Sequence, residues 1–329
     1  METFFYKNVY LNETSTVAGL YEKNGPLGHY FDKTYDDMYF GEKSFEKAEI
    51  KSVREAINIL LKKVGLTGGE IDLVVGGDLL NQIAASTYGS INCGKGFIGV
   101  YGACSTIAMA IIVAGSLVNT KMINNAVCVT SSHNMGSEKQ FRNPTEYGAP
   151  KPDTATFTAT GGAACLLTSE KSDIKVEDVT IGKIIDYEEN DPNHMGRVMA
   201  PAAIDTLLNH FKETGRKPEY YDLIVTGDLG IYGKEIVVEA LEKEGYSLDN
   251  YDDCGTMLYD LGRQKDVKAG GSGPVCSALV TFGYIFDQLK KKKLKKVLVV
   301  PTGALFSPTL IYQKENINSI AHAISLEAV

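Results

Sequence analysis

The chain has 329 residues, of which 44% are hydrophobic and 22% charged, a composition typical of a soluble globular protein that excludes a disordered chain. Its formal net charge of -8 argues against general binding to nucleic acid or anionic lipid. The N-terminal residues show no signal peptide, and the longest apolar stretch, 107–118, is shorter than the roughly 20 residues that cross a bilayer. The six cysteines form no CxxC pair, so we expect a reduced, intracellular protein without a metal site.

Helices and strands are predicted in alternation along the chain. Apolar residues recur at i, i+3, i+4 and i+7 spacing over 53–64 and again over 203–211, which predicts two amphipathic helices. Short β-branched runs predict strands that are buried on both faces. These runs are IDLVVGG from Ile71, FIGVYGA from Phe97, AVCVTSS from Ala126, DLIVTGD from Asp222 and KVLVVPTG from Lys296. The alternation predicts an α/β fold.

Two segments of the chain recur in the same order. DLVVGGDL at 72–79 returns as DLIVTGDL at 222–229, and GACSTIAMAIIVAG from Gly102 is matched by GPVCSALVTFGYIF from Gly273. Each glycine-preceded helix then leads to a strand. We therefore predict two related halves, residues 1–175 and 176–329.

A cysteine, Cys104, stands at the start of the predicted helix of the first half. Two related halves with this cysteine resemble the thiolase and ketoacyl synthase superfamily, and the resemblance implies a layered α/β/α/β/α fold. In those enzymes the helix N-terminus lowers the pKa of the thiol, because unpaired N–H groups stabilise the thiolate. The resemblance gives Cys104 the same placement.

The resemblance also implies partner residues in the second half, and these are missing. The superfamily has a histidine after the strand that is LIVTGD here, where this chain has Gly227 followed by Asp228. It has a histidine or asparagine before the second glycine-rich helix, where this chain has Gly271. Asp228 is a poor donor to an oxyanion unless it is protonated. We therefore expect a thiolase fold without condensation chemistry, catalytic residues or cofactor.

The segment 131–162 is rich in polar side chains and follows the strand after the Cys104 helix. A long polar loop of this kind commonly carries function, and its cations could clamp a carboxylated ligand. The alternative is a loop that faces the partner subunit of a dimer. The residues in question are His133, Asn134, Lys139, Arg142 and Lys151.

Four longer segments sharpen the resemblance: YFDKTYDDMYFGEKSFEKAE, GVYGACST, TSSHNMGSEKQFRNPTEYGAPKP and AGGSGPVCSALV. They resemble the stage V sporulation protein AD family of spore-forming bacteria. That family implies a noncatalytic protein that binds dipicolinic acid, alone or with calcium, and supports its uptake into the forming spore. It further implies membrane-embedded sporulation partners and a peripheral location on the inner membrane of the forespore. The resemblance to the thiolase and ketoacyl synthase superfamily implies a homodimer.

The expected ligand is a small planar dianion, and its pocket is expected to have three parts. These are a helix N-terminus at Cys104, Ser105 and Thr106; a glycine-rich turn with Gly271 and Ser272 whose N–H groups form an anion nest; and the cations of segment 131–162, with Asp228 nearby. The alternative function is a Cys104-dependent acyltransferase of the ketoacyl synthase type.

The basic run QLKKKKLKK at 288–296 has two interpretations. It is the solvated C-terminal end of a helix, where cations favour the negative end of the dipole, or it contacts anionic lipid or a membrane partner. The sequence alone favours the first.

Overall fold

The computed structural model describes residues 2–142 and 150–329 of the chain. The longer helices are α2 (Phe45–Val64), α4 (Thr106–Asn119), α6 (Met195–Thr214) and α7 (Gly230–Lys243). The shorter ones are α1 (Leu20–Lys23), α3 (Ala84–Gly89), α5 (Asn134–Ser137), α8 (Cys254–Met257), α9 (Pro274–Leu279), α10 (Phe286–Lys290) and α11 (Pro308–Tyr312). Two π-helical segments, Glu138–Arg142 and Val280–Ile285, continue α5 and α9.

The strands of the first half of the chain are β1 (Thr3–Phe5), β2 (Tyr10–Ala18), β3 (Lys33–Thr34), β4 (Leu73–Gly77), β5 (Phe97–Gly99), β6 (Asn125–Ser132), β7 (Phe157–Thr158) and β8 (Gly161–Thr168). The strands that follow are β9 (Ile174–Ile181), β10 (Leu223–Thr226), β11 (Tyr251–Asp253), β12 (Gly271–Ser272), β13 (Lys296–Val300), β14 (Thr302–Ala304) and β15 (Ser319–Ala328).

One large sheet contains the same strand order twice. Its path runs β11-β10-β13-β15-β9 and then β2-β8-β6-β4-β5. If the five strands of each set are numbered 1 to 5 in the order in which they occur along the chain, both sets have the same spatial order. From the edge of the sheet to its centre, that order is 3-2-4-5-1. The sets meet where Tyr10 of β2 pairs with Lys175 of β9. The division of the chain after residue 175 stays a prediction. That boundary lies inside β9, after the second residue of the strand.

Equivalent aspartates perform the same local task in the two sets. Asp72, before β4, accepts a hydrogen bond at 2.9 Å from the backbone N–H of Asn124, which precedes β6. Asp222, before β10, accepts one at 2.9 Å from the N–H of Lys296, which begins β13. Both carboxylates thus tie the start of one parallel strand to its neighbour. The recurring DL motif of the sequence therefore marks the same structural position twice.

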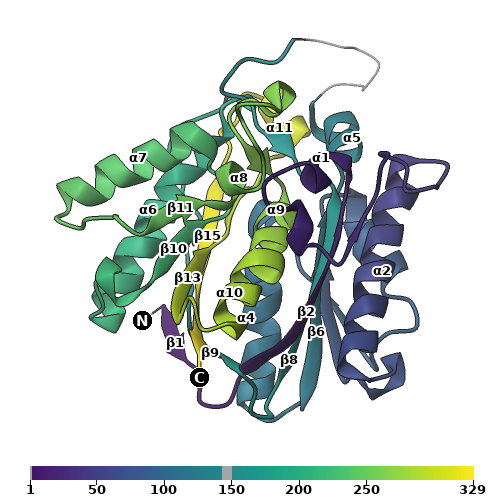
Figure 1. Ribbon diagram of the computed structural model, residues 1–329. Coiled ribbons are helices and arrows are strands. Elements are labelled where there is room, and N and C mark those ends of the chain that lie inside the picture. Colours follow the sequence, from purple (N-terminus) through teal and green to yellow (C-terminus); the bar gives the residue numbers. More distant parts are fainter. Residues whose placement is uncertain (1, 143–149) are drawn as a thin grey trace.

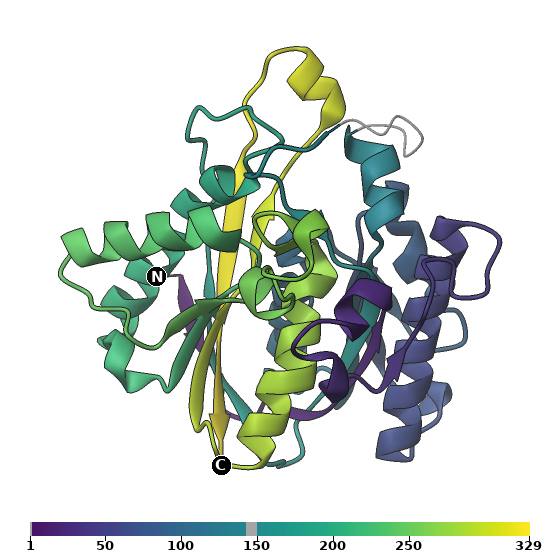
Figure 2. The same cartoon turned by 45° about the horizontal axis from the view of Figure 1, so that its top comes forward.

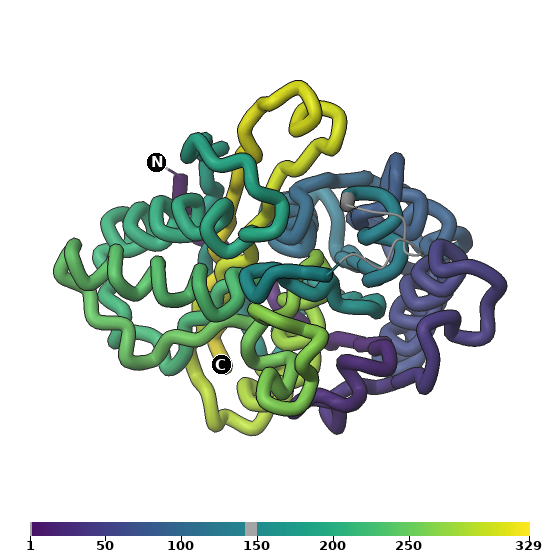
Figure 3. The backbone as a smooth tube through the Cα atoms, turned by 90° about the horizontal axis from the view of Figure 1, so that it is seen from above, coloured from purple at the N-terminus to yellow at the C-terminus, as the bar shows by residue number. Residues whose placement is uncertain are grey.

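Helices and strands form five layers (Figure 1). Helices α4 and α9 contact each other between the two strand sets, where they share one apolar core with strands of both. Helix α2 covers the outer face of β2, β6 and β8, and α6 and α7 form a separate apolar core with the outer face of the other set. The view from above in Figure 3 shows α2 and the α6/α7 pair on opposite flanks. This is the predicted α/β/α/β/α layering.

Local sequence explains why α2 forms where it does. The Ser44 side chain caps its start by accepting from the N–H of Lys47, and Gly65 ends it at a φ of 71°, a left-handed conformation that glycine adopts without strain. Val53, Ala56 and Leu60 lie on one buried face, as the apolar spacing predicts. The five predicted strands correspond to β4, β5, β6, β10 and β13.

One end of the molecule carries both α5 and α11. Figures 1 and 2 show these two short helices at the same end, beyond the ends of the central strands. In residues 2–142 and 150–329, no helix is both long enough and apolar enough to span a membrane.

Candidate functional site

Cys104 lies in a tight turn that leads directly into α4. Residues Ala103–Ser105 form a single 3₁₀ turn, and Ala103 has a φ of 50°, which is unusual for a residue with a side chain. The hydroxyl of Ser105 donates to the carbonyl of Gly102 at 2.7 Å, and that of Thr106 donates to the carbonyl of Ala103 at 2.6 Å. The hydroxyls of Ser105 and Thr106 are therefore used to hold the turn.

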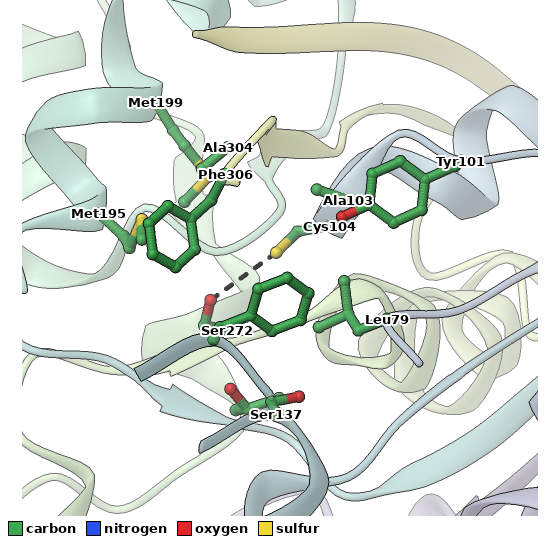
Figure 4. Close-up of a pocket in the computed structure, with 12 residues that line it drawn as sticks. Leu79, Tyr101, Ala103, Cys104, Ser137, Met195, Met199, Ser272, Ala304 and Phe306 are labelled. Atoms are coloured by element: carbon green, nitrogen blue, oxygen red, sulfur yellow. Dashed lines mark hydrogen bonds between the residues drawn. The ribbon is translucent and has the colours of Figure 1, made fainter. Parts of the chain in front are cut away.

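Ser272 from the second half of the chain faces the Cys104 thiol. It belongs to β12, which pairs with β7, and its Oγ lies 3.8 Å from Cys104 Sγ (Figure 4). The Ser272 hydroxyl donates to Oδ2 of Asp228 at 3.0 Å. The predicted meeting of Cys104, Ser272 and Asp228 is therefore present in the structure.

The carboxylate of Asp228 accepts hydrogen bonds from several groups around this site. Oδ2 accepts from the Ser272 hydroxyl and, at 3.1 Å, from the N–H of Gly273, while Oδ1 accepts from the Thr302 hydroxyl at 2.8 Å. The glycine-rich turn was expected to offer its N–H groups to an external anion. Instead, the N–H of Gly273 binds the protein's own carboxylate, so this part of the expected nest is occupied.

The structure overturns the expectation of an acidified thiol. Burial raises the pKa of Cys104 well above its usual value, and the nearby carboxylate of Asp228 raises it further. Burial also raises the pKa of Asp228 to about 6, although its hydrogen bonds oppose this shift. At neutral pH the site thus holds a protonated thiol beside an ionised, fully hydrogen-bonded carboxylate.

Neither of the two glycines at the missing partner positions has room for a side chain. A Cβ on Gly227 would lie 2.9 Å from Cα of Pro301, and one on Gly271 would lie 2.8 Å from the Tyr259 ring. Both distances are shorter than atoms in contact allow. The backbone at Pro301 would have to move before an imidazole or a carboxamide fitted at position 227, and the buried ring of Tyr259 would have to move before one fitted at position 271.

A small, largely apolar cavity of about 50 Å³ opens in front of Cys104. This volume is several times the roughly 10–15 Å³ that one water molecule needs. Figure 4 shows side chains from both halves of the chain around it. This inner cavity is lined by Leu79, Tyr101, Ala103, Cys104, Ser137, Phe141, Thr158, Met195, Met199, Ser272, Ala304 and Phe306.

The predicted cations do not line the inner cavity. Lys139 forms an ion pair with Glu46 at 2.8 Å, and Lys151 forms one with Glu138 at 2.8 Å. Each lysine therefore faces an acid of this chain, and the side chain of Arg142 lies outside the described residues. Among the described residues no lysine, arginine or histidine contributes to the cavity lining.

His133 and Asn134 are buried beside the cavity without lining it. His133 caps α5 by accepting from the N–H of Met135, and its other ring nitrogen donates to the carbonyl of Met38 at 2.7 Å. Burial lowers the pKa of His133 to about 4, so the ring is neutral at neutral pH. The Asn134 N–H donates to Thr160 at 3.0 Å. These two residues shape the wall behind the site.

A wider groove of about 530 Å³ adjoins the inner cavity on its outer side. Leu79, Tyr101, Phe141 and Phe306 line both spaces, and the rings of Phe141 and Phe306 lie 5.8 Å apart between centroids. These four side chains form the throat between them. The groove also contains polar side chains, namely Asn81, Gln82, Gln140, Ser307 and Thr309.

Sequence reasoning missed the apolar lining of the cavity. Leu79, Tyr101 and Phe141 stand within quoted motifs, but Met199 and Phe306 have nothing in the sequence that separates them from core residues. Within residues 2–142 and 150–329, no group of three His, Cys, Asp or Glu side chains is arranged to hold a metal ion.

Gly303 lets β14 approach the Cys104 turn closely. A Cβ at this position would lie 2.1 Å from the carbonyl oxygen of Gly102 and 3.1 Å from the nitrogen of Ser105. We predict that Gly303→Ala lowers the free energy of unfolding by about 1–3 kcal/mol, as other overpacking substitutions do. Denaturant unfolding checks this against Gly69→Ala, whose added Cβ meets nothing within 4 Å. Equal midpoints for the two variants would contradict the close approach.

Comparison with solved structures identifies the fold. A crystal structure of a variant of OleA from Xanthomonas campestris superposes with a TM-score of 0.62, at 13% identity, covering 98% of this chain and 99% of that one. The 3-oxoacyl-(acyl carrier protein) synthase III, FabH, of Xanthomonas oryzae pv. oryzae gives a TM-score of 0.60 at 14% identity, covering 98% and 100%. These likenesses confirm the thiolase-like fold.

Comparison with sequences goes further than the fold. The family model described as stage V sporulation protein AD (SpoVAD) matches residues 2–327. The stage V sporulation protein AD of Bacillus subtilis (strain 168) is 47% identical over 324 residues, which cover 98% of this chain and 95% of that protein. The family match and this relative span the Cys104 turn, the Asp228 network and the cavity lining alike, and the chain therefore belongs to the stage V sporulation protein AD family.

Proposed function

We propose that this protein binds dipicolinic acid (pyridine-2,6-dicarboxylic acid) in the inner cavity and supports its uptake into the forming spore without catalysing a reaction. The observation that carries the proposal is the combination of a retained cavity beside Cys104 with a closed network around Asp228. The cavity keeps room for a small ligand. The network occupies the place of the base and the donor that acyl transfer requires.

Three features argue against catalysis at Cys104. The thiol pKa is raised, whereas the nucleophile in acyl transfer is the thiolate. The positions of Gly227 and Gly271 have no space for a histidine or an asparagine. Asp228 accepts hydrogen bonds from Ser272, Gly273 and Thr302, and these bonds stabilise its ionised form and lower its pKa, which makes it a weaker base for the thiol.

The lining of the cavity favours a flat aromatic ligand. Tyr101, Phe141 and Phe306 provide aromatic faces, and methionine side chains adapt to the shape of a ring. Ser137 is buried and borders the cavity, and its hydroxyl has no hydrogen-bond partner among the described residues. A ring that carries carboxylates would satisfy this hydroxyl while its apolar faces contact the aromatic walls.

The proposal includes the partners that the family resemblance implies. We expect a homodimer that lies peripherally on the inner membrane of the forespore and contacts membrane-embedded proteins of the same uptake system. The basic run at 288–296 is the candidate contact with such a partner or with anionic lipid. In the structure Lys290 pairs with Glu13 and Lys291 with Asp287, which leaves the run partly neutralised.

Calorimetric titration with dipicolinic acid, with and without calcium, tests the proposal directly. We expect saturable binding to the wild type and none of benzoate, which has one carboxylate and no ring nitrogen. Ala304 borders the inner cavity, so Ala304→Leu should fill it and abolish binding. Ala304→Gly, at the same position, should leave binding in place.

Two results would overturn the proposal. One is no heat with dipicolinic acid from a wild-type protein whose folding is verified by circular dichroism. The other is acylation of Cys104 by an acyl thioester, detected as a mass increase on the Cys104 peptide. The second result would favour a Cys104-dependent acyltransferase.

A further inference from the structure

Two hydroxyls of the inner cavity lining, those of Tyr101 and Thr158, have no hydrogen-bond partner in residues 2–142 and 150–329. Thr158 is only 4% exposed. A buried hydroxyl normally has a partner, so a free one beside a cavity indicates a place where a ligand can bind. The hydroxyl of Ser272, which also faces the cavity, already donates to Asp228. Tyr101 and Thr158 therefore have O–H groups that the protein itself does not use.

Tyr101 is held at the entrance to the Cys104 turn. The backbone N–H of the next residue, Gly102, donates to the Thr106 hydroxyl at 3.1 Å, which fixes the chain there. Figure 4 shows the Tyr101 hydroxyl directed toward the turn that carries Cys104. The ring also lines the outer groove, which leaves the residue 44% exposed. Burial of its hydroxyl end raises the pKa of Tyr101 to about 12, so the group keeps its proton and can donate at neutral pH.

Thr158 is held beside Ser272 by the pairing of two short strands. β7 and β12 run parallel, and Thr158 is the register partner of Ser272. The N–H groups on both sides of Thr158 donate to this strand. That of Phe157 donates to the carbonyl of Gly270 at 2.9 Å, and that of Ala159 to the carbonyl of Ser272 at 2.8 Å. The backbone of Thr158 is therefore fixed while its hydroxyl stays free.

A ligand that presents acceptors matches these two free hydroxyls. Ionised dipicolinic acid has acceptors at its ring nitrogen and its carboxylate oxygens, and it has no donor of its own. A hydrogen bond to a charged carboxylate is stronger than one between neutral groups. The carboxylate of Asp228, which binds Ser272 from behind, opposes an ionised ligand by repulsion. Donors in the cavity lining are therefore needed to offset this cost.

We infer that Tyr101 and Thr158 are specificity-determining residues of the inner cavity, and that their hydroxyls donate to carboxylate oxygens of the ligand. This inference rests on the proposed function, and it names the groups that distinguish a ring dicarboxylate from an apolar ring of the same size. It gives to two uncharged donors the role that the sequence predicted for cations.

Two variants that conserve shape test the inference. Tyr101→Phe and Thr158→Val each remove a hydroxyl and leave nearly the same volume. In calorimetric titration at neutral pH, each should weaken the binding of dipicolinic acid at least about tenfold, because a carboxylate oxygen loses its partner. Tyr88→Phe is the matched control. Tyr88 is exposed and does not contribute to the cavity lining, so this variant should bind as the wild type does.

Unfolding of the free protein separates a ligand contact from a structural role. A hydroxyl without a partner adds no hydrogen bond to the folded state. Thr158→Val and Tyr101→Phe should therefore unfold at the same concentration of guanidinium chloride as the wild type, or at a higher one. Thr302→Val is the matched control, because the Thr302 hydroxyl donates to Asp228 at 2.8 Å, and this variant should unfold at a lower concentration.

The outcomes separate this inference from the proposed function. Weaker binding by both variants, with the stability of the free protein retained, supports it. The inference is overturned if either variant binds dipicolinic acid as tightly as the wild type, or if either is destabilised as Thr302→Val is. In those cases binding by the wild type still supports the proposed function. If the wild type does not bind dipicolinic acid, the proposed function fails and the inference fails with it.

Discussion

In the native protein at pH 8, iodoacetamide is expected to alkylate Cys104 at least about 100-fold more slowly than it alkylates the same cysteine in the unfolded chain. The reagent reacts with the thiolate, and every unit by which the pKa rises above the pH lowers the thiolate fraction about tenfold. Burial and the carboxylate of Asp228 raise the pKa of Cys104 well above its usual value. Limited access through the throat slows the reaction further.

Mass spectrometry of the Cys104 peptide over time measures this rate. The control is the chain in guanidinium chloride, where all six cysteines are exposed and comparable. Asp228→Asn should speed the native reaction, because it removes the negative charge that opposes the thiolate. Alkylation of native Cys104 faster than in the unfolded chain would reveal an activated nucleophile and would contradict a purely binding role.

The superfamily resemblance indicated which residues meet at the site, but it did not indicate the pKa of the thiol. The repeat in the sequence placed Cys104, Ser272 and Asp228 at related ends of two halves, and the structure brings them together. The direction of the thiol pKa was predicted wrongly. A helix N-terminus does favour a thiolate, but the carboxylate of Asp228 and complete burial act against it, and neither can be judged before the chain folds.

The predicted cationic clamp shows a second limit of the sequence. Lys139 and Glu46 are 93 positions apart along the chain, yet their charged atoms lie 2.8 Å from each other. Such pairing depends on how α2 packs beside α5, which composition does not indicate. The same holds for His133, whose burial against Met38 makes it a neutral helix cap. The sequence therefore predicted Lys139 and His133 as parts of a ligand clamp, but in the folded chain both side chains bind other groups of the protein.

Strands that contain many hydroxyl residues were the hardest part of the fold to predict from the sequence. β2 contains Thr14, Ser15 and Thr16, which read as loop residues, yet all three are buried at the centre of the sheet. The hydroxyl of Thr14 donates to the carbonyl of Phe282, and that of Ser15 donates to the carbonyl of Ala56. Polar side chains are tolerated there because helices on both faces supply acceptors, a fact that belongs to the tertiary structure.

A buried glutamate gives the protein an expected dependence of stability on pH. Glu22, in α1, is fully buried, and its Oε1 accepts from the Tyr259 hydroxyl and from the N–H of Thr160 at 3.0 Å. Its Oε2 has no hydrogen-bond partner within the part of the chain that the structure describes, and burial raises the pKa of Glu22 to about 7. The folded state therefore holds this proton more tightly than the unfolded chain, whose glutamate titrates near its ordinary value of 4.5.

The sign of the effect follows from this difference. Stability from Glu22 is fully present below the pKa of the unfolded state and is lost as the pH rises through about 7. We predict that the change in the free energy of unfolding between pH 5 and pH 8 differs by about 2–3 kcal/mol between the wild type and Glu22→Gln, with the wild type losing more. Glutamine fits because its carbonyl accepts the same two hydrogen bonds and it carries no charge at either pH.

Comparing two variants isolates Glu22 from other buried groups. Burial raises the pKa of Asp253 to about 7, so Asp253 also makes the protein less stable as the pH rises. Burial lowers the pKa of His322 to about 4 and that of His210 to about 3. These two histidines make the protein more stable as the pH rises toward the ordinary histidine pKa. All of these groups remain in both proteins, so their contributions cancel in the difference. Guanidinium chloride unfolding at the two pH values measures it, with the exposed Glu239→Gln as the matched control. If Glu22→Gln and Glu239→Gln behave alike, Glu22 is ionised in the folded state as readily as a surface glutamate, and burial does not govern its proton.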